Sequence, residues 1–168
     1  MSTAEASTTG GAIAADDRVQ ARWLTAEQQT AWRNYLLGAA RLSERLDADL
    51  RKFGIDLGEY EILVTLEESP GRRVRMSELA DRVHQSRSRL THTIARMEKS
   101  NLVVRTMCPS DRRGVWAQLT PTGFDLLKSA APSHVACVRR NFVEAVGEQD
   151  FAVLGRAFAA VLAVENDD

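Results

Sequence analysis

Residues 77–119 contain the feature that most restricts the fold of this chain: two short helical patterns, a tight turn between them, and a hairpin pattern directly after them. Ser77 is placed to cap a brief first helix, and Ser86 is placed to cap a second helix over residues 87–100. Only the three residues 84–86 separate the two patterns. We therefore predict two consecutive helices joined by a short turn.

The hairpin pattern follows the second helix at once. Two Val-rich segments, residues 103–107 and 115–119, are predicted strands, because β-branched residues favour extended backbone. The stretch between them, residues 108–114, is rich in turn-forming and charged residues. This order of elements is the winged variant of the helix-turn-helix. The predicted fold class is therefore mainly α with a small β-wing.

Long helical patterns flank this core motif. The first runs from a cap at Thr25 to Gly54, and a shorter helix is predicted over residues 57–68. One apolar face of the first helix holds Trp32, Leu36, Ala39, Leu42, Leu46, Leu50 and Phe53. After the wing, a Thr120-Pro121 start predicts a long helix with a kink or break at Pro132, and a last helix covers about 148–164. These helices carry more apolar surface than one thin domain covers, so we predict a flanking long-helix dimerisation region.

The chain divides into four expected segments. Residues 1–24 form a Ser-, Thr- and Gly-rich tail that we expect to be mobile. Residues 25–56 form a dimerisation helix, residues 57–119 the winged helix-turn-helix, and residues 120–164 further dimerisation helices.

Composition excludes several protein classes. The 168 residues suit a single domain, and no apolar run is long enough to span a bilayer. We expect a cytoplasmic protein, because the first residues lack a secretory signal pattern and the two Cys form no disulfide framework. The sequence holds no dinucleotide, P-loop, zinc-protease or nucleophile-elbow motif, so we predict neither an enzyme nor a cofactor.

Charge is segregated toward the middle of the chain. Residues 71–113 hold eleven Lys and Arg against four Asp and Glu, a net charge of +7, whereas the whole chain carries −1. Such a block indicates either an anionic partner or a merely solvated basic face. Ten of the eleven are Arg, a side chain that forks onto phosphate and guanine edges.

The second short helix has two distinct faces. Leu90, Ile94 and Met97 lie close together on a helical wheel and are predicted to be buried. The opposite arc suits the major groove of DNA, although any soluble helix exposes charge opposite its core. The predicted contacts of this helix with bases and phosphates are Arg87, Ser88, Arg89, His92, Arg96 and Lys99.

The wing tip is also basic. Arg112 and Arg113 are predicted to enter a minor groove, where negative potential attracts Arg. Asp111 is predicted to pair with Arg113 and so to shape the tip. The alternative is a solvent-exposed loop that does not contact DNA.

The run MSELADRVHQSRSRLTHTIARMEKSNLVVRTMCPSDRRGVWAQLTPTG resembles MarR-type (multiple antibiotic resistance) regulators. The segments SELA and SRSRLTHTIARMEKSNLV match the two short helices, and DRRGVWAQLTPTG is close to the D-x-R…LT-x-x-G pattern of the wing. With the long helices, the resemblance covers about residues 25–164. It implies an obligate homodimer that binds a palindromic operator in double-stranded DNA, usually as a repressor. It also implies release by a small phenolic or anionic ligand, with Ser88, Arg89, His92 and Arg96 in the base-reading arc.

The sequence says less about the small-molecule effector than about the DNA-binding motif. Trp32, Tyr35, Tyr60 and His134 are candidates to line a ligand pocket, with core packing as the alternative. A second hypothesis is redox sensing through Cys108, and a third is a winged module that binds protein and not DNA. No metal site is predicted, because the three His residues lack ligand spacing.

Overall fold

A computed structural model of the chain describes residues 22–108 and 111–164, but not the side chains at 108 and 111–113. The chain separates into two compact units, Met1–Tyr35 and Leu36–Asp168. The mobile tail predicted over residues 1–24 lies almost entirely outside the described residues. No helix of the described part is long and apolar enough to cross a bilayer.

The first unit contains the start of helix α1 (Ala26–Leu50). The predicted cap is confirmed, because the Gln28 N–H donates to Thr25 Oγ1 at 3.2 Å and the Thr25 N–H donates to Gln28 Oε1 at 2.9 Å. Further along the helix, the rings of Trp32 and Tyr35 stack with centroids 5.6 Å apart. Both side chains stay about half exposed.

The second unit continues α1 to Leu50 and closes it with the short turn η1 (Arg51–Phe53). Gly54 follows in the left-handed region at φ 79°, which confirms its predicted place at the helix end. Helix α2 (Leu57–Glu67) then begins behind a full capping box formed by Asp56 and Glu59.

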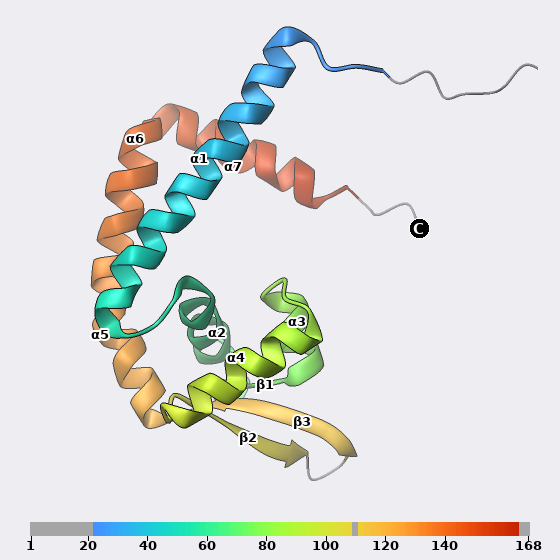
Figure 1. The fold of residues 1–168 in the computed structure, drawn as a ribbon, viewed down its shortest axis with the longest axis vertical. Coiled ribbons are helices and arrows are strands. Elements are labelled where there is room, and N and C mark those ends of the chain that lie inside the picture. The colour runs from blue at the N-terminus through green and yellow to red at the C-terminus, as the bar shows by residue number, and fades with distance from the viewer. Residues whose placement is uncertain (1–21, 109–110, 165–168) are drawn as a thin grey trace, which may run out of the picture. The chain divides into compact units, whose positions relative to one another are not determined.

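A three-stranded antiparallel sheet and two short helices form the winged motif (Figure 1). Its strands are β1 (Arg73–Arg75), β2 (Val103–Cys108) and β3 (Asp111–Leu119), in the order β1-β3-β2. Register is fixed by pairs such as Val74 with Ala117, and Val103 with Leu119. Helix α3 (Met76–Arg82) follows β1 directly, and helix α4 (Arg87–Lys99) precedes β2.

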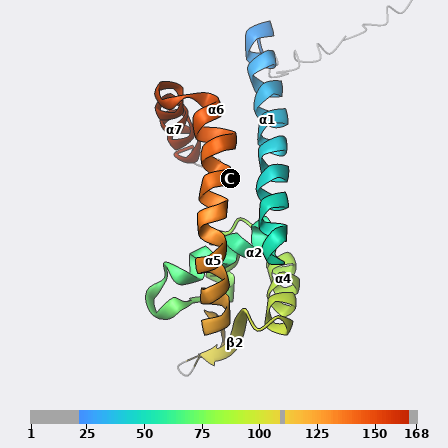
Figure 2. The same cartoon turned by 90° about the vertical axis from the view of Figure 1, so that its left-hand side faces the viewer.

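The chain then leaves the sheet through a continuous helical stretch, which Figure 2 shows running from the hairpin to α6. Thr120 caps α5 (Pro121–Val138) by accepting from the Gly123 N–H at 3.0 Å. A π-helical turn η3 (Arg139–Val143) joins α5 to α6 (Glu144–Val146), and α7 (Glu148–Leu162) follows Gly147.

One apolar core holds the winged motif together. It is built from α2, α3, α4, the sheet and the start of α5, and its fully buried large side chains include Leu63, Leu79 and Leu90. The predicted buried face of α4 is confirmed, because Leu90, Ile94 and Met97 are all 0% exposed. Burying such side chains contributes roughly 1.5–3 kcal/mol each. The core therefore fixes α4 against the rest of the motif.

Two local predictions are wrong, and a third is wrong in one of its two alternatives. Ser77 does not cap α3, because the helix begins one residue earlier, at Met76, directly after β1, and no side chain caps it. The break predicted at Pro132 does not occur, because α5 continues to Val138, and the kink that was its alternative stays a prediction. The loop of the hairpin is shorter than predicted, since β3 begins at Asp111 and not at residue 115. At Ser77 and in the hairpin, strand pairing with distant residues outweighs the local signal.

Candidate nucleic-acid interface

The turn that precedes helix α4 sets the direction in which the helix begins. His84 adopts a left-handed conformation at φ 48°, and the Gln85 N–H donates to the Ala80 carbonyl at 2.9 Å. Ser86 then caps α4, as predicted, by accepting from the Arg89 N–H at 3.2 Å. The chain thereby turns from α3 into α4 within the four residues 83–86. The helix starts with a defined direction.

The face of α4 opposite the core is exposed and cationic. Its residues Arg87, Ser88, Arg89, His92, Arg96 and Lys99, which sequence analysis predicted to contact DNA, are all exposed. Thr93 lies between them and is buried at 8% exposure, with its hydroxyl donating to the Arg89 carbonyl at 3.1 Å. DNA contact by the exposed residues stays a prediction, and their common placement on one accessible face is what that prediction requires.

Arg96 differs from its neighbours on this face. Its Nε donates to Glu59 Oε1 and its second guanidinium nitrogen donates to Asp56 Oδ2, each at 2.8 Å. These bonds raise the pKa of Arg96, chiefly through the hydrogen bond to Glu59. A base contact made through Nε would require Arg96 to release a Glu59 carboxylate that is 8% exposed, and a base contact made through its other N–H groups would have to accept the orientation that the two carboxylates impose. No sequence pattern indicates this pairing, because it joins residues 37 and 40 positions apart.

The base of the wing is hydrogen-bonded to α4. Arg105 on β2 donates through its backbone N–H and its Nε to the two carboxylate oxygens of Glu98, both at 2.9 Å. Burial raises the pKa of Glu98, but the hydrogen bonds and charge of Arg105 outweigh it, and the net shift is downward. The backbone of residues 111–113 lies at the far end of β3. The predicted pair of Asp111 with Arg113, and the groove contact of Arg112, fall on side chains outside the described residues.

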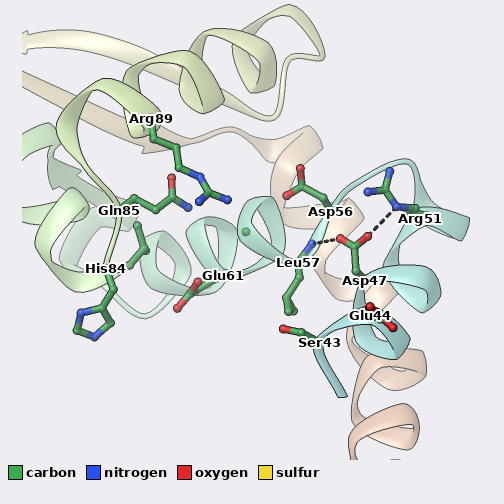
Figure 3. Close-up of a pocket in the computed structure, with 12 residues that line it drawn as sticks. Ser43, Glu44, Asp47, Arg51, Asp56, Leu57, Glu61, His84, Gln85 and Arg89 are labelled. Carbon is green, nitrogen blue, oxygen red and sulfur yellow. Dashed lines mark hydrogen bonds and ion pairs between the residues drawn. The ribbon is translucent and has the colours of Figure 1, made fainter. Parts of the chain in front are cut away.

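A polar cavity of about 550 Å³ opens beside the start of α4 (Figure 3). Arg89 and Gln85 lie on one side of it, and Asp47 and Arg51 lie on the other. Asp47 accepts from the Leu57 N–H at 3.0 Å and from Arg51 Nε at 2.7 Å, and the backbone hydrogen bond is the main reason for its lowered pKa. The cavity therefore borders both the end of α1 and the exposed face of α4.

The four residues predicted to line a ligand pocket occur as two separate pairs. Tyr60 and His134 pack with ring centroids 4.3 Å apart, and burial raises the pKa of Tyr60 and lowers that of His134. Trp32 and Tyr35 form the exposed stack of the first unit. None of the four lines the cavity beside α4. Tyr60 is 8% exposed, which agrees with the alternative that it packs in the core.

The structure also shows the surroundings of Cys137 and whether metal-binding side chains cluster. Cys137 is 3% exposed and lies against the Arg45 carbonyl and Asn141, whereas the side chain of Cys108 lies outside the described residues. Among the residues with described positions, no group of three His, Cys, Asp or Glu side chains could hold a metal ion.

Comparison with known proteins adds a family relationship. The model of the MarR family matches residues 55–115, which span α2, α3, α4, β2 and the start of β3. AbsC, a MarR family transcriptional regulator from Streptomyces coelicolor, is 46% identical over 84% of this chain and 96% of its own, with a TM-score of 0.80. Sco3205 from the same organism, solved in complex with DNA, is 42% identical over 86% of this chain and 91% of its own, with a TM-score of 0.82.

A curated relative is more distant. The transcriptional repressor MprA of Escherichia coli is 28% identical over 101 residues. This match covers 60% of the present chain and spans 57% of the length of MprA.

Proposed function

Because the chain belongs to the MarR family of transcriptional regulators, we propose that it is a homodimer that binds a pseudo-palindromic operator in double-stranded DNA. Membership confirms the prediction of a regulator and not an enzyme. The predicted fold class is confirmed as well, since the solved relatives are MarR regulators of the same fold. Operator binding by this chain is the proposal, and the DNA complex of Sco3205 supports it.

The exposed cationic face of α4 carries the proposal. The apolar side of the helix is fully buried in the core, so the opposite side is presented to solvent. Arg89 and His92 lie one turn apart on that surface, and Arg87 lies at the helix start, where free N–H groups favour a phosphate. The hairpin extends beside it, with Arg112 and Arg113 near its far end.

Exposed apolar side chains on the flanking helices support the homodimer. Leu36 and Leu37 on α1 are 46% and 62% exposed, and Val161 and Leu162 on α7 are 65% and 80% exposed. Such surface is normally covered in a stable protein. We propose that residues 25–56 and 120–164 supply the dimer contacts, and that a twofold axis places the two copies of α4 about one DNA turn, roughly 34 Å, apart.

We further propose that the protein represses transcription and is released by a small phenolic or anionic ligand. The name of MprA, a transcriptional repressor, supports the direction of regulation. The cavity beside α4 supports the ligand, because Arg89 forms part of its wall. An anion held there would compete with DNA for the same guanidinium, and such differential binding is what an effector needs.

The function is tested by selecting bound fragments from the source genome and then measuring the affinity of Arg89→Ala for the selected operator. We expect the wild type to recover a palindrome, and Arg89→Ala to lose about 1–3 kcal/mol of discrimination against wrong bases, because a bidentate base contact is removed. Arg22→Ala, which removes an exposed Arg outside the winged motif and the proposed dimer segments, is the matched control and should bind like the wild type. A wild type that selects no fragment at modest ionic strength would overturn the proposal and would favour a module that binds protein.

Arg112→Ala tests the wing separately. We expect weaker binding to every duplex and a less steep dependence of log affinity on log salt, because one phosphate or minor-groove contact is lost. Affinity is measured by fluorescence anisotropy over a series of salt concentrations. An unchanged slope together with unchanged affinity would show that the wing does not contact DNA.

A further inference from the structure

The start of α2 carries an ionic cluster that does more than cap the helix. Asp56 Oδ1 accepts from the Glu59 N–H at 2.8 Å, and Glu59 Oε2 accepts from the Asp56 N–H at 2.9 Å. These bonds complete the reciprocal capping box. One oxygen of each carboxylate is left over, and both of these oxygens are directed at α4.

Arg96 donates a hydrogen bond to each of the two remaining carboxylate oxygens. Its Nε reaches Glu59 Oε1 and its terminal nitrogen reaches Asp56 Oδ2, so a single guanidinium bridges the two carboxylates. Bidentate charged bonds of this kind fix orientation as well as distance. The bridge joins the exposed face of α4 to the first turn of α2, a neighbour in space that is 37 residues away in sequence.

A directional link matters here because the exposed side of α4 meets the first turn of α2 across an open polar cavity and not through apolar packing. A cavity of about 270 Å³ is lined by the first turn of α2 and by α4, and its wall includes Gly58, Arg89, His92 and Arg96. Apolar contacts elsewhere along α4 hold the helix against the core, but they are not directional. Rotation of the helix about its axis is therefore restrained at this point by the bridge.

We propose that Arg96 is a positioning residue, which locks α4 to the capping box of α2 and so presents Arg89 and His92 to DNA; the inference rests on the proposed function. Arg96 then belongs to the interface without contacting a base. Two of its guanidinium nitrogens are bound to the carboxylates in the free protein and stay bound to them in the complex. Loss of the bridge lets α4 turn, and every operator sequence is bound less well.

The test compares Arg96→Ala, Glu59→Gln and the double variant with the wild type on the selected operator and on a panel of single-base operator variants. We expect each single variant to bind about tenfold more weakly across the whole panel. The order of base preference and the salt slope should both stay as in the wild type. The double variant should bind no more weakly than Arg96→Ala, because both changes break one bridge. Arg22→Ala, which removes an exposed Arg ahead of α1 and outside every segment assigned here to DNA, ligand or dimer contacts, should bind like the wild type.

A second measurement separates positioning from general stability. All affinities are measured far below the unfolding temperature of each variant, and Arg96→Lys, which keeps the charge but not the fork, should be intermediate. A lower unfolding temperature with unchanged affinity would overturn the positioning role. So would a loss of base preference at one operator position in Arg96→Ala, which would make Arg96 a base-reading residue. Wild-type protein that binds no operator would instead overturn the proposed function, and the inference with it.

Discussion

Leu36→Asp is expected to convert the homodimer into a monomer and to weaken operator binding by roughly 10²- to 10⁴-fold. The side chain lies on α1 and is 46% exposed in the single chain, within the apolar surface that we assign to the dimer. Burying a new carboxylate in such a contact is strongly unfavourable without a paired cation. The loss in affinity is large because two linked copies of α4 bind one operator, and a separated copy no longer gains from the second half-site.

Sedimentation velocity and operator titration of the same samples check this expectation. Phe158→Asp on α7 tests the second part of the surface independently, since that ring is 38% exposed. Ala31→Asp is the matched control, because it also adds one negative charge to an exposed position of α1, but on the side away from both Leu36 and Leu37. A Leu36→Asp protein that sediments as a dimer and binds normally would show that the interface lies elsewhere.

The elements of this fold were predictable from sequence where the signal is local. Thr25, Ser86 and Thr120 each precede an apolar helical pattern, and each caps its helix in the structure. The burial of Leu90, Ile94 and Met97 follows from spacing alone, because period and burial are linked in an amphipathic helix. Such information lies within a few residues of the element that it defines.

The misplaced features depend on partners that are distant in sequence. Ser77 has the chemistry of a cap, yet β1 pairs with β3 up to Arg75 and leads directly into α3, so the helix starts two residues earlier than a cap at Ser77 would give. The extension of β3 to Asp111 depends on pairing with β2, including an irregularity between Met107 and Cys108. Sequence spacing does not reveal either constraint.

In the candidate interface, too, the features set by local sequence could be predicted and those set by distant contacts could not. A helical wheel places Arg89, His92 and Arg96 on one arc, and the structure places all three on one exposed face. The wheel cannot show that Asp56 and Glu59 meet Arg96 there, because that contact is set by the packing of α2 against α4. Residues on one face of a helix can therefore have different roles, and tertiary contacts decide which of them is available to a ligand.

Gly123→Ala is expected to destabilise the fold by roughly 3 kcal/mol, although Gly→Ala within a helix normally stabilises by about 1 kcal/mol. Gly123 lies in the first turn of α5, and a Cβ atom there would lie 2.1 Å from the Leu102 carbonyl oxygen and 2.9 Å from Leu119 Cδ1. The first of these is backbone and cannot rotate away. That carbonyl also accepts from the Thr120 N–H and hydroxyl, so relief of the clash disturbs the cap of α5.

The clash outweighs helix propensity because it requires the hairpin and α5 to move apart at their junction. Thermal unfolding at a fixed protein concentration should show a Tm lowered by roughly 6–12 °C, at about 2–4 °C per kcal/mol for a chain of this length. Gly38→Ala on α1 is the matched control, since no atom lies within 4 Å of the place that its new Cβ would take, and its Tm should stay equal or rise. If both variants unfold at or above the wild-type temperature, the close approach of α5 to Leu102 is not a constraint on this fold.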